Sequence, residues 1–528
     1  MLDHKVFTFF NELYKTLKQQ DVEILKHFNC DEVSDNDYFF YGISSDIISN
    51  SLHILINYLS GNIESAGVDT SCRTILEALT IIEMNKNGEI THLQKKIYRY
   101  SYAYVDLDNF HAILTNEMKD SPELQKVMAD KETCKDAILK HFGCTPKDLK
   151  KRDIFIDDPC FYLKKDLSTN IKFSKLLKKY FPKNKQISEL YEFFSLFIHP
   201  RCEINPQAEE SIMEIRKIYI NIVLDIVHNY LKNSKLLSTN EGITDFNDDF
   251  FNNPLLRNNV HNIKQIELGI NLIKKELCFL PNGEDAFTWF FLEKIRYLLI
   301  DMETSLSLGY KEHVIACFKP FIELFSVFFE VNSVDINEFD YIKKGYWISS
   351  RLQIIEHFKT LEIKFNINEY EEELKNLYEN YYKDKYGLVK LENFVDKLQH
   401  NSLYFLSNQK KSFNKMVRSA IENIFASDKK KSINAFTLYR LSKDMGHASG
   451  YNFNATTRII DTSCHKVLLT VYTCLLYFLV NAGLTLEEHK LKPKLRNIIE
   501  FIKLICEEHS KTLEQQYKKF KLETETHN

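Results

Sequence analysis

The chain has 528 residues, enough for roughly two to four domains of about 150 residues each, and its 44% hydrophobic content excludes a wholly disordered protein. It contains only 14 Gly and 10 Pro, so few turns are expected and sandwiches, barrels, collagen and Gly-rich nucleotide-binding folds are excluded. The formal net charge of −4 excludes a globally basic nucleic-acid binder but leaves room for a local basic face.

Apolar residues recur at three- and four-residue spacing through the first part of the chain, which indicates amphipathic helices. The helices predicted there cover 4–27, 37–60, 65–85, 90–117, 172–180, 186–198 and 208–231. A segment rich in Asn, Asp, Ser and Thr then follows, from Asn233 to Asn259, and is predicted to be a linker. No stretch alternates with period two, so the predicted fold class is all-α.

The last part of the chain contains an uncharged stretch from Val467 to Leu486 that is long enough to span a bilayer. It also carries polar residues, among them Thr470, Tyr472 and Asn481, so a fully buried core helix is the favoured interpretation and no membrane association is expected. A long charged helix is predicted over 490–521.

Comparison of the sequence with itself indicates a tandem duplication. At a shift of 248 residues Leu190-Tyr191 falls on Leu438-Tyr439, and His199 falls on His447. With a slip of two residues, Arg73-x-x-x-Glu77 falls on Lys319-x-x-x-Glu323; with a larger gap, Phe173-x-Lys175 falls on Phe413-x-Lys415. We therefore predict two homologous helical-bundle domains, 1–233 and 260–528, joined by a linker over 234–259.

The matched pairs Arg73/Glu77 and Lys319/Glu323 are the first candidates for a site. Four-residue spacing places each pair on one helix face. Arg73 lies in an otherwise apolar stripe, where a charge has to be paired or functional. Two interpretations stay open: a buried ion pair that holds the bundle in register, or a functional pair.

The second group of candidates consists of Arg440, His447 and His199. Each histidine is predicted to end a helix that starts near Tyr191 or Tyr439, where it could titrate near neutrality. Arg440 and His447 are separated by nearly two helical turns and would project from one side, whereas the first repeat has Glu192 in place of the arginine. The alternatives are histidines that bond the last helix carbonyls and a solvated surface arginine.

Two basic segments precede these histidines. Residues 140–186 contain thirteen Lys/Arg and five Asp/Glu, and residues 410–443 contain nine and two. Aromatic residues interleave both, which suits a phosphate-rich partner as well as an ordinary solvated lysine surface. The candidate nucleic-acid-binding residues are Lys410, Lys411, Lys415, Arg418, Lys443, Lys164, Lys165 and Lys175.

The spacing from Arg440 to His447, at the end of a helix in an all-helical domain, resembles the higher eukaryotes and prokaryotes nucleotide-binding (HEPN) superfamily. The combination of Arg73 and Glu77 with Tyr191, Ser195 and His199 looks close to a helical bacterial family of unknown function. The resemblance implies metal-independent RNA cleavage by a toxin or antiphage defence protein. His447 would be the general acid and base for attack by the ribose 2′-hydroxyl, and Arg440 would stabilise the phosphate charge.

The sequence also departs from that pattern, because Leu441 replaces the small polar residue that usually follows the arginine. An asymmetric single site, a homodimer through the second repeat and an inactive scaffold all stay open. The alternative function is therefore a non-catalytic helical module that binds RNA or a protein partner, such as an antitoxin or a second copy. No metal or cofactor is predicted. The 11 Cys, without a C-x-x-C pair, and the absence of a signal pattern predict a cytoplasmic location.

Overall fold

The protein is helical throughout the part of the chain that its structure, a computed structural model, describes. The described residues are 67–95, 122–143, 172–182, 187–198, 254–277, 286–307, 311–332, 413–426, 428–445, 457–488 and 496–508, with parts of 216–229 and 372–383 and the single residues 145, 163 and 511. Of these residues 93% are helical and none is in a strand. The predicted all-α class is confirmed for this part of the chain.

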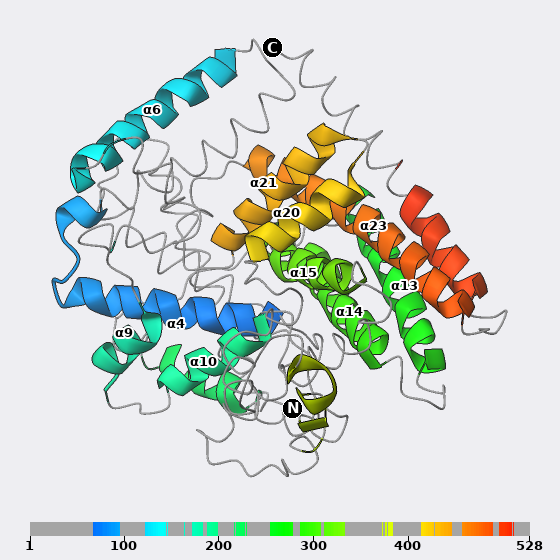
Figure 1. The fold of residues 1–528 in the computed structure, drawn as a ribbon. Helices are drawn as coiled ribbons and strands as arrows, with labels where there is room; N and C mark the ends of the chain where they lie inside the picture. Colours follow the sequence, from blue (N-terminus) through cyan, green and yellow to red (C-terminus); the bar gives the residue numbers. More distant parts are fainter. Residues whose placement is uncertain are drawn as a thin grey trace, which may run out of the picture.

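Three helices of the first half pack against one another: α4 (Gly67–Lys86), α9 (Phe173–Tyr180) and α10 (Ile187–Ile198). Figure 1 shows them as one group on the left of the molecule. Phe193 and Phe194 of α10 are fully buried and stack edge-on against Tyr219 in the helical part of 216–229. The apolar faces that the sequence periodicity predicted are thus the faces that form this core.

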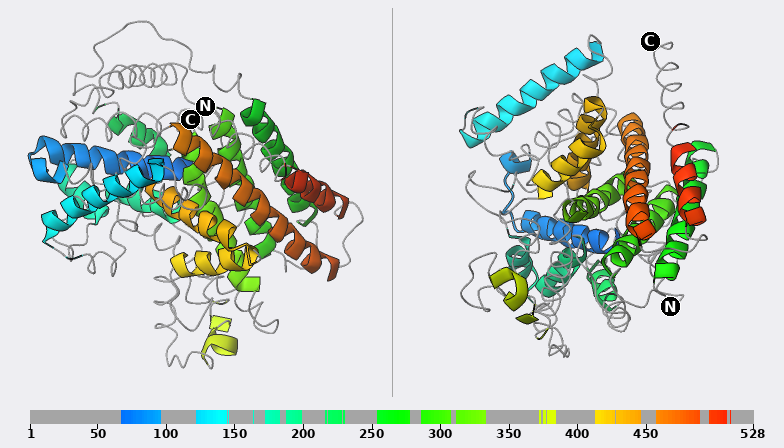
Figure 2. Two further views of the ribbon diagram at one scale, coloured as in Figure 1. Left: turned by 90° about the horizontal axis from the view of Figure 1, so that it is seen from above. Right: turned by 45° about the vertical axis from the view of Figure 1, so that its right-hand side comes forward.

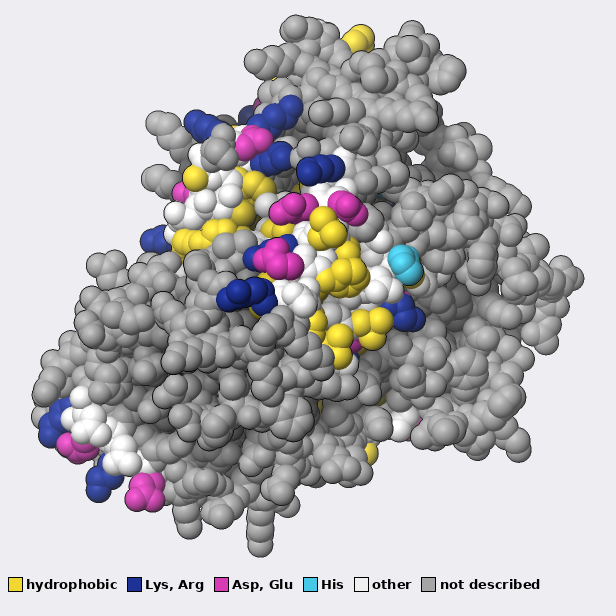
Figure 3. Space-filling model, turned by 90° about the vertical axis from the view of Figure 1, so that its right-hand side faces the viewer, with side chains coloured by type: hydrophobic (Ala, Val, Ile, Leu, Met, Phe, Trp, Pro, Cys, Tyr) yellow, Lys and Arg dark blue, Asp and Glu magenta, His cyan; other side chains and the backbone are white. Residues whose placement is uncertain are grey.

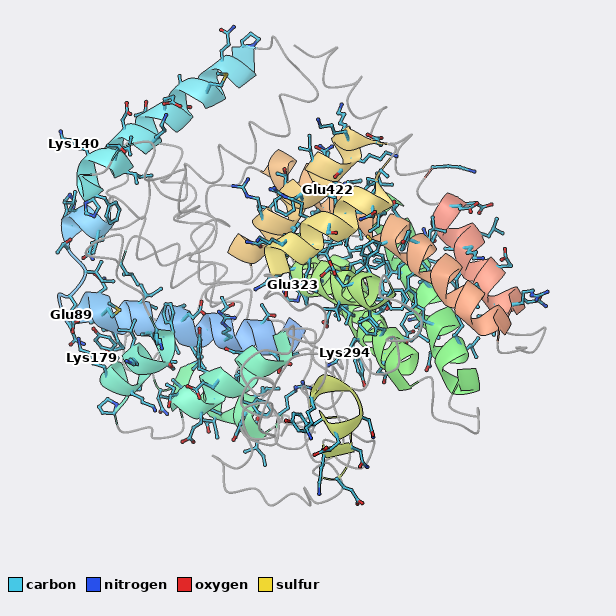
Figure 4. The ribbon with its side chains drawn as sticks, viewed as in Figure 1. Glu89, Lys140, Lys179, Lys294, Glu323 and Glu422 are labelled. Atoms are coloured by element: carbon cyan, nitrogen blue, oxygen red, sulfur yellow. The ribbon has the colours of Figure 1, made fainter. Side chains whose placement is uncertain are left out.

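The end of α4 shows how the sequence sets a helix boundary. Gly88 adopts a left-handed φ of 68°, and the amides of Gly88 and Glu89 donate to the carbonyls of Asn85 and Met84, both at 3.0 Å. This is a Schellman motif, in which glycine avoids the steric penalty of the left-handed conformation. The turn aims Glu89 at α9, where its carboxylate accepts hydrogen bonds from Lys179 Nζ at 2.8 and 2.6 Å and from the Tyr180 hydroxyl. Figure 4 shows Glu89 and Lys179 together at this end of α4.

The second half is built around α15 (Lys311–Asn332), which contacts α14 (Ala286–Ser307), α20 (Phe413–Ile424), α21 (Lys429–Met445) and α23 (Thr457–Glu488). α13 (Pro254–Leu277) packs along α14, and a helix at 496–508 lies beside α13 (Figures 1 and 2). Nearly every side chain described on α15 between Val314 and Val331 is buried, so this helix is the centre of the core. A short π-helical turn, η3, covers Tyr378–Tyr382.

One described helix of the first half, where the helix ranges were predicted individually, escaped the sequence analysis. α6 (Pro122–Phe142) has mostly exposed residues, with Ile138 its one fully buried side chain among those described, and it stands at the edge of the molecule (Figure 2). Such a helix has no continuous apolar stripe, so a search for hydrophobic periodicity does not find it. Its sequence does carry another signal, a proline at the first helical position.

Most predicted helices that fall on described residues are found. The helices at 65–85, 172–180 and 186–198 correspond to α4, α9 and α10, and parts of those at 208–231 and 490–521 are helical. Val467–Leu486 lies within α23 and its described apolar residues are largely buried, as expected of a core helix. None of the helices described is both long and apolar enough to cross a bilayer. The predictions for 4–27, 37–60 and most of 90–117 lie outside the described residues.

Two boundaries differ from the prediction. α13 begins at Pro254, inside the predicted linker, because proline is well suited to the first turn of a helix. α21 begins at Lys429 rather than near Tyr439. Asp428 explains this start, because its carboxylate accepts the Lys431 amide at 3.0 Å and caps the helix.

Candidate functional site

A glutamate of α4 is the centre of a small polar cluster in the first half. Arg73 Nε donates to Glu77 Oε1 at 3.0 Å, and the Tyr191 hydroxyl of α10 donates to the same oxygen at 2.9 Å. The Arg73 guanidinium carbon lies 5.5 Å from the centre of the Tyr191 ring. Glu77 is only 1% exposed, so its charge depends on these donors. The predicted ion pair therefore exists, and a tyrosine from a second helix completes it.

The electrostatics of this cluster follow from burial. Burial raises the pKa of the Tyr191 hydroxyl, and the Glu77 carboxylate raises it further. Burial alone would lower the pKa of Arg73, but Glu77 and Tyr191 outweigh it and raise that pKa. Both groups therefore keep their protons at neutral pH and act as hydrogen-bond donors to the carboxylate rather than as proton-transfer groups.

The second half contains a matching tyrosine–glutamate bond. The hydroxyl of Tyr439, a fully buried residue of α21, donates to Glu323 Oε1 of α15 at 2.9 Å. Lys319 lies one turn before Glu323 on α15, and both residues are buried. Glu323 lies beneath the α20–α21 hairpin in Figure 4. As in the first half, the bond joins a tyrosine on one helix to a glutamate on another.

The match extends beyond these bonds. Three residues after each glutamate a fully buried hydroxyl bonds its own helix: Thr80 to the Leu76 carbonyl at 2.7 Å, and Ser326 to the Glu323 carbonyl at 2.7 Å. The helices also correspond, because α4, α9 and α10 contact one another pairwise, as do α15, α20 and α21. The matched sequence positions therefore occupy matched positions in two similar three-helix groups.

The α20–α21 hairpin carries the candidate nucleic-acid interface. Lys415 and Arg418 lie one turn apart on α20 and are exposed, and the Arg418 guanidinium carbon lies 4.7 Å from the ring centre of Phe436 on α21. Phe436 lies one helical turn before Arg440, which is partly exposed, so this contact also brings Arg418 to the part of α21 that carries Arg440. The structure thus brings Lys415, Arg418 and Arg440 to one region of the hairpin.

More cations lie at the other end of this hairpin. Lys429, Lys430 and Lys431 are exposed in the first turn of α21, where the helix dipole disfavours positive side chains. The described acidic residues nearby are Glu422, labelled in Figure 4, and the capping Asp428. An excess of positive charge that opposes the helix dipole favours an anionic partner at this surface.

The remaining predicted residues are distributed unevenly. Lys175 is exposed on α9, in the first half. Lys443 lies within α21, which ends at Met445. His199, His447, Lys410, Lys411, Lys164 and Lys165 lie outside the described residues. The predicted juxtaposition of Arg440 with His447 therefore stays a prediction.

A buried ion pair was not anticipated from the sequence. Arg216 donates from Nε and Nη2 to the two carboxylate oxygens of Asp69 at 3.0 and 2.9 Å, and both side chains are buried. These residues are 147 positions apart, so no local spacing reveals the pair. Burial, with a smaller contribution from Asp69, also raises the pKa of Cys72 well above its ordinary value. This thiol therefore stays protonated and unreactive.

Among the described residues, no group of three or more His, Cys, Asp and Glu side chains could hold a metal ion. The described cysteines are buried, and none of them is in a disulfide: Cys72, Cys317, Cys464, Cys474 and Cys506. Comparison with known proteins adds no relative: no family model, no curated protein and no solved structure matches the chain.

Proposed function

We propose that the chain is a HEPN-like, metal-independent ribonuclease that engages RNA through the α20–α21 hairpin. The observation that carries the proposal is the group of cations on this hairpin: Arg440 is partly exposed one turn after Phe436, and the exposed Arg418 of α20 lies over the Phe436 ring. Phosphate oxygens are the ligands that suit such a cluster, because Arg and Lys bind them by charge-assisted hydrogen bonds.

In the proposed reaction His447 accepts the proton of a ribose 2′-hydroxyl, which attacks the adjacent phosphorus and displaces the 5′-oxygen. A proton returned to the leaving oxygen completes the cleavage and yields a 2′,3′-cyclic phosphate. Arg440 stabilises the charge that develops on the phosphate oxygens. A cell that carries such an enzyme would use it in the cytoplasm as a toxin or defence effector.

We also propose that domains 1–233 and 260–528 arose by duplication. The supporting observation is the pair of equivalent hydrogen bonds, Tyr191 to Glu77 and Tyr439 to Glu323, within two corresponding groups of helices. The first half has exposed Glu192 where the second has Arg440, so the proposed enzyme has one active half.

The alternative is a non-catalytic module that binds RNA or a protein partner through the same hairpin. Exposed Lys429, Lys430 and Lys431, which lie at the far end of the hairpin from Arg440, favour it, because they would contribute to binding without touching a reacting phosphate.

A cleavage assay separates the two functions. Purified protein is incubated with total RNA in EDTA beside Arg440→Ala, His447→Ala and, as a matched control on another surface, Arg496→Ala. Cleavage that is lost in the first two variants and kept in the control supports the ribonuclease. Equal cleavage in all four samples, or none in any, refutes the assignment of Arg440 and His447.

RNA affinity gives a second readout. If Lys415 and Arg418 contact phosphates, each alanine variant should reduce the slope of log affinity against log salt by about one. An unchanged slope would remove the hairpin from the binding surface.

Growth arrest on expression that is relieved by His447→Ala but not by His199→Ala would support a single active half.

A further inference from the structure

We propose that Arg418 of α20 and Phe436 of α21 form a stacking site for an unpaired base of the bound RNA. Such a site deepens the proposed function, on which it rests, because it takes the α20–α21 hairpin to be the surface that RNA meets. It adds a contact to a base, where the cations of the hairpin contact only phosphates. Three observations support it: the contact that Arg418 makes, the side chains around it, and the residues at the matching positions of the first half.

The first observation is that Arg418 lies over an aromatic ring rather than against a carboxylate. Glu422 follows Arg418 by four residues on α20, at the spacing that allows an ion pair on one helix face. The guanidinium carbon of Arg418 instead lies over the Phe436 ring, 4.7 Å from its centre, and Arg418 forms no ion pair with any described residue. Because Arg418 is exposed and Phe436 is partly exposed, a ligand can reach this pair.

The second observation is the order of side chains along the outer face of α21. Ile433 is 44% exposed one turn before Phe436, and Arg440 is partly exposed one turn after it. Lys429 and Lys430 are exposed one turn before Ile433. Residues three and four positions apart are neighbours on a helix surface. An apolar and aromatic centre therefore lies between cations at both ends of this face.

This order of side chains suits a single strand of RNA better than it suits phosphate groups alone. Phosphates bind to cations, whereas the face of a base stacks on an aromatic ring or on the plane of a guanidinium. Arg418 can do both, because its N–H groups can donate to a phosphate oxygen while its flat face stacks. Bases within a duplex are already stacked on their neighbours, so the site takes an unpaired base.

The third observation is that the first half lacks this pair at the matching positions. The offsets of the sequence comparison, 240 residues at α9 and 248 at α10, match Arg418 to Lys178 and Phe436 to Ser188. Lys178 is exposed and Ser188 is buried, so no ring lies there for the cation to cover. The buried tyrosine–glutamate bond occurs in both halves. The cation–aromatic pair thus accompanies Arg440 rather than the core that the two halves have in common.

Another group of exposed apolar residues provides a contrast and a control. It lies on α13 and the helix at 496–508 and consists of Leu268, Leu272, Phe501 and Leu504. Figure 3, which looks onto this side of the molecule, shows hydrophobic side chains among both cationic and anionic ones. Mixed charge of this kind does not favour a polyanion. Phe501, which is 50% exposed, is therefore the control for the loss of an exposed ring.

The test measures binding of the full chain to a fluorescent 2′-O-methyl RNA strand of about ten nucleotides, a length within the usual range of single-strand sites. This probe lacks the attacking hydroxyl and is not cleaved. A second probe has the same backbone with abasic positions. The wild type should bind the strand with bases about tenfold more tightly than the abasic strand, because only bases can stack. Both strands should show the same slope of log affinity against log salt, because their phosphates are the same.

Two variants test the pair itself. Phe436→Leu keeps an apolar side chain and removes the ring, and Arg418→Lys keeps the charge and removes the planar face. Each should weaken binding of the strand with bases about tenfold and leave both the affinity for the abasic strand and the salt slope unchanged. Phe501→Leu should bind both strands as the wild type does. Circular dichroism checks that each variant is folded.

The outcomes separate this site from the proposed ribonuclease. Equal affinity of the wild type for the two strands, or no binding of either, overturns the stacking site without any variant. Variants that bind the strand with bases as tightly as the wild type, or that lose affinity for the abasic strand equally, overturn it as well. All of these results leave the cleavage assay in EDTA as the separate test of the enzyme. A confirmed stacking site in a protein that does not cleave RNA would support the non-catalytic module instead.

Discussion

Removal of the Tyr439 hydroxyl tests the role of the buried glutamate–tyrosine bonds. Tyr439→Phe keeps the ring and deletes only the donor that lies 2.9 Å from Glu323 Oε1. A hydrogen bond to a charged group contributes about 1.5–3 kcal/mol when its loss leaves the partner buried. Because Tyr439 is fully buried, we expect the free energy of unfolding to fall by about 2 kcal/mol. This corresponds to a drop in melting temperature of about 4–8 °C for a domain of this size.

Tyr191→Phe is the matched comparison in the first half. Here Arg73 still donates to the same oxygen of Glu77, and Tyr191 is only partly buried. The expected loss is therefore smaller, about 1 kcal/mol. Differential scanning calorimetry of the full chain measures both variants, and resolves whether the halves unfold separately. A larger loss for Tyr191→Phe, or none for Tyr439→Phe, would refute the argument that burial sets the strength of these bonds.

Three further predictions concern stability and are measured by urea or thermal unfolding. Asp69→Asn should cost about 3–5 kcal/mol, because it leaves a buried arginine without its counter-charge, whereas Glu83→Gln at an exposed pair should change stability by less than about 0.5 kcal/mol. Burial lowers the pKa of His313 from 6.5 to about 4. As the pH falls from 6.5 to 4 the unfolded chain therefore takes up a proton that the folded chain does not, and the wild type should lose about 3 kcal/mol more than His313→Gln. Gly269→Ala should destabilise the wild type by about 1 kcal/mol through contact with Ile502, yet stabilise an Ile502→Ala background by about the same amount through helix propensity.

The sequence predicts those parts of the fold that have a local signal. α4 and α10 have apolar residues at helical spacing, and both lie close to their expected ranges. α6 does not, because an exposed helix needs no apolar stripe. α21 begins earlier than predicted, because three lysines in a first turn resemble a loop and only the Asp428 cap indicates the start of the helix.

The tyrosine–glutamate bonds show a different limit. Glu323 and Tyr439 are 116 residues apart, so no spacing rule connects them. The sequence did match both residues to counterparts in the first half, but it offered the lysine or arginine on the same helix as the partner of each glutamate. Helical spacing reveals neighbours on one helix and is blind to a donor that packing brings from another.

The buried tyrosine also determines what its neighbour can do. Successive residues on a helix point about 100° apart, so a Tyr439 directed at Glu323 turns Arg440 toward the outer side of α21. In the first half the same bond at Tyr191 turns the exposed Glu192 outward from α10. The same buried tyrosine–glutamate bond thus turns a cation, Arg440, outward in the second half and an anion, Glu192, outward in the first half. A polyanion would be attracted to the α20–α21 hairpin and repelled from position 192, so two halves with the same buried bond differ in the charge that their surfaces present.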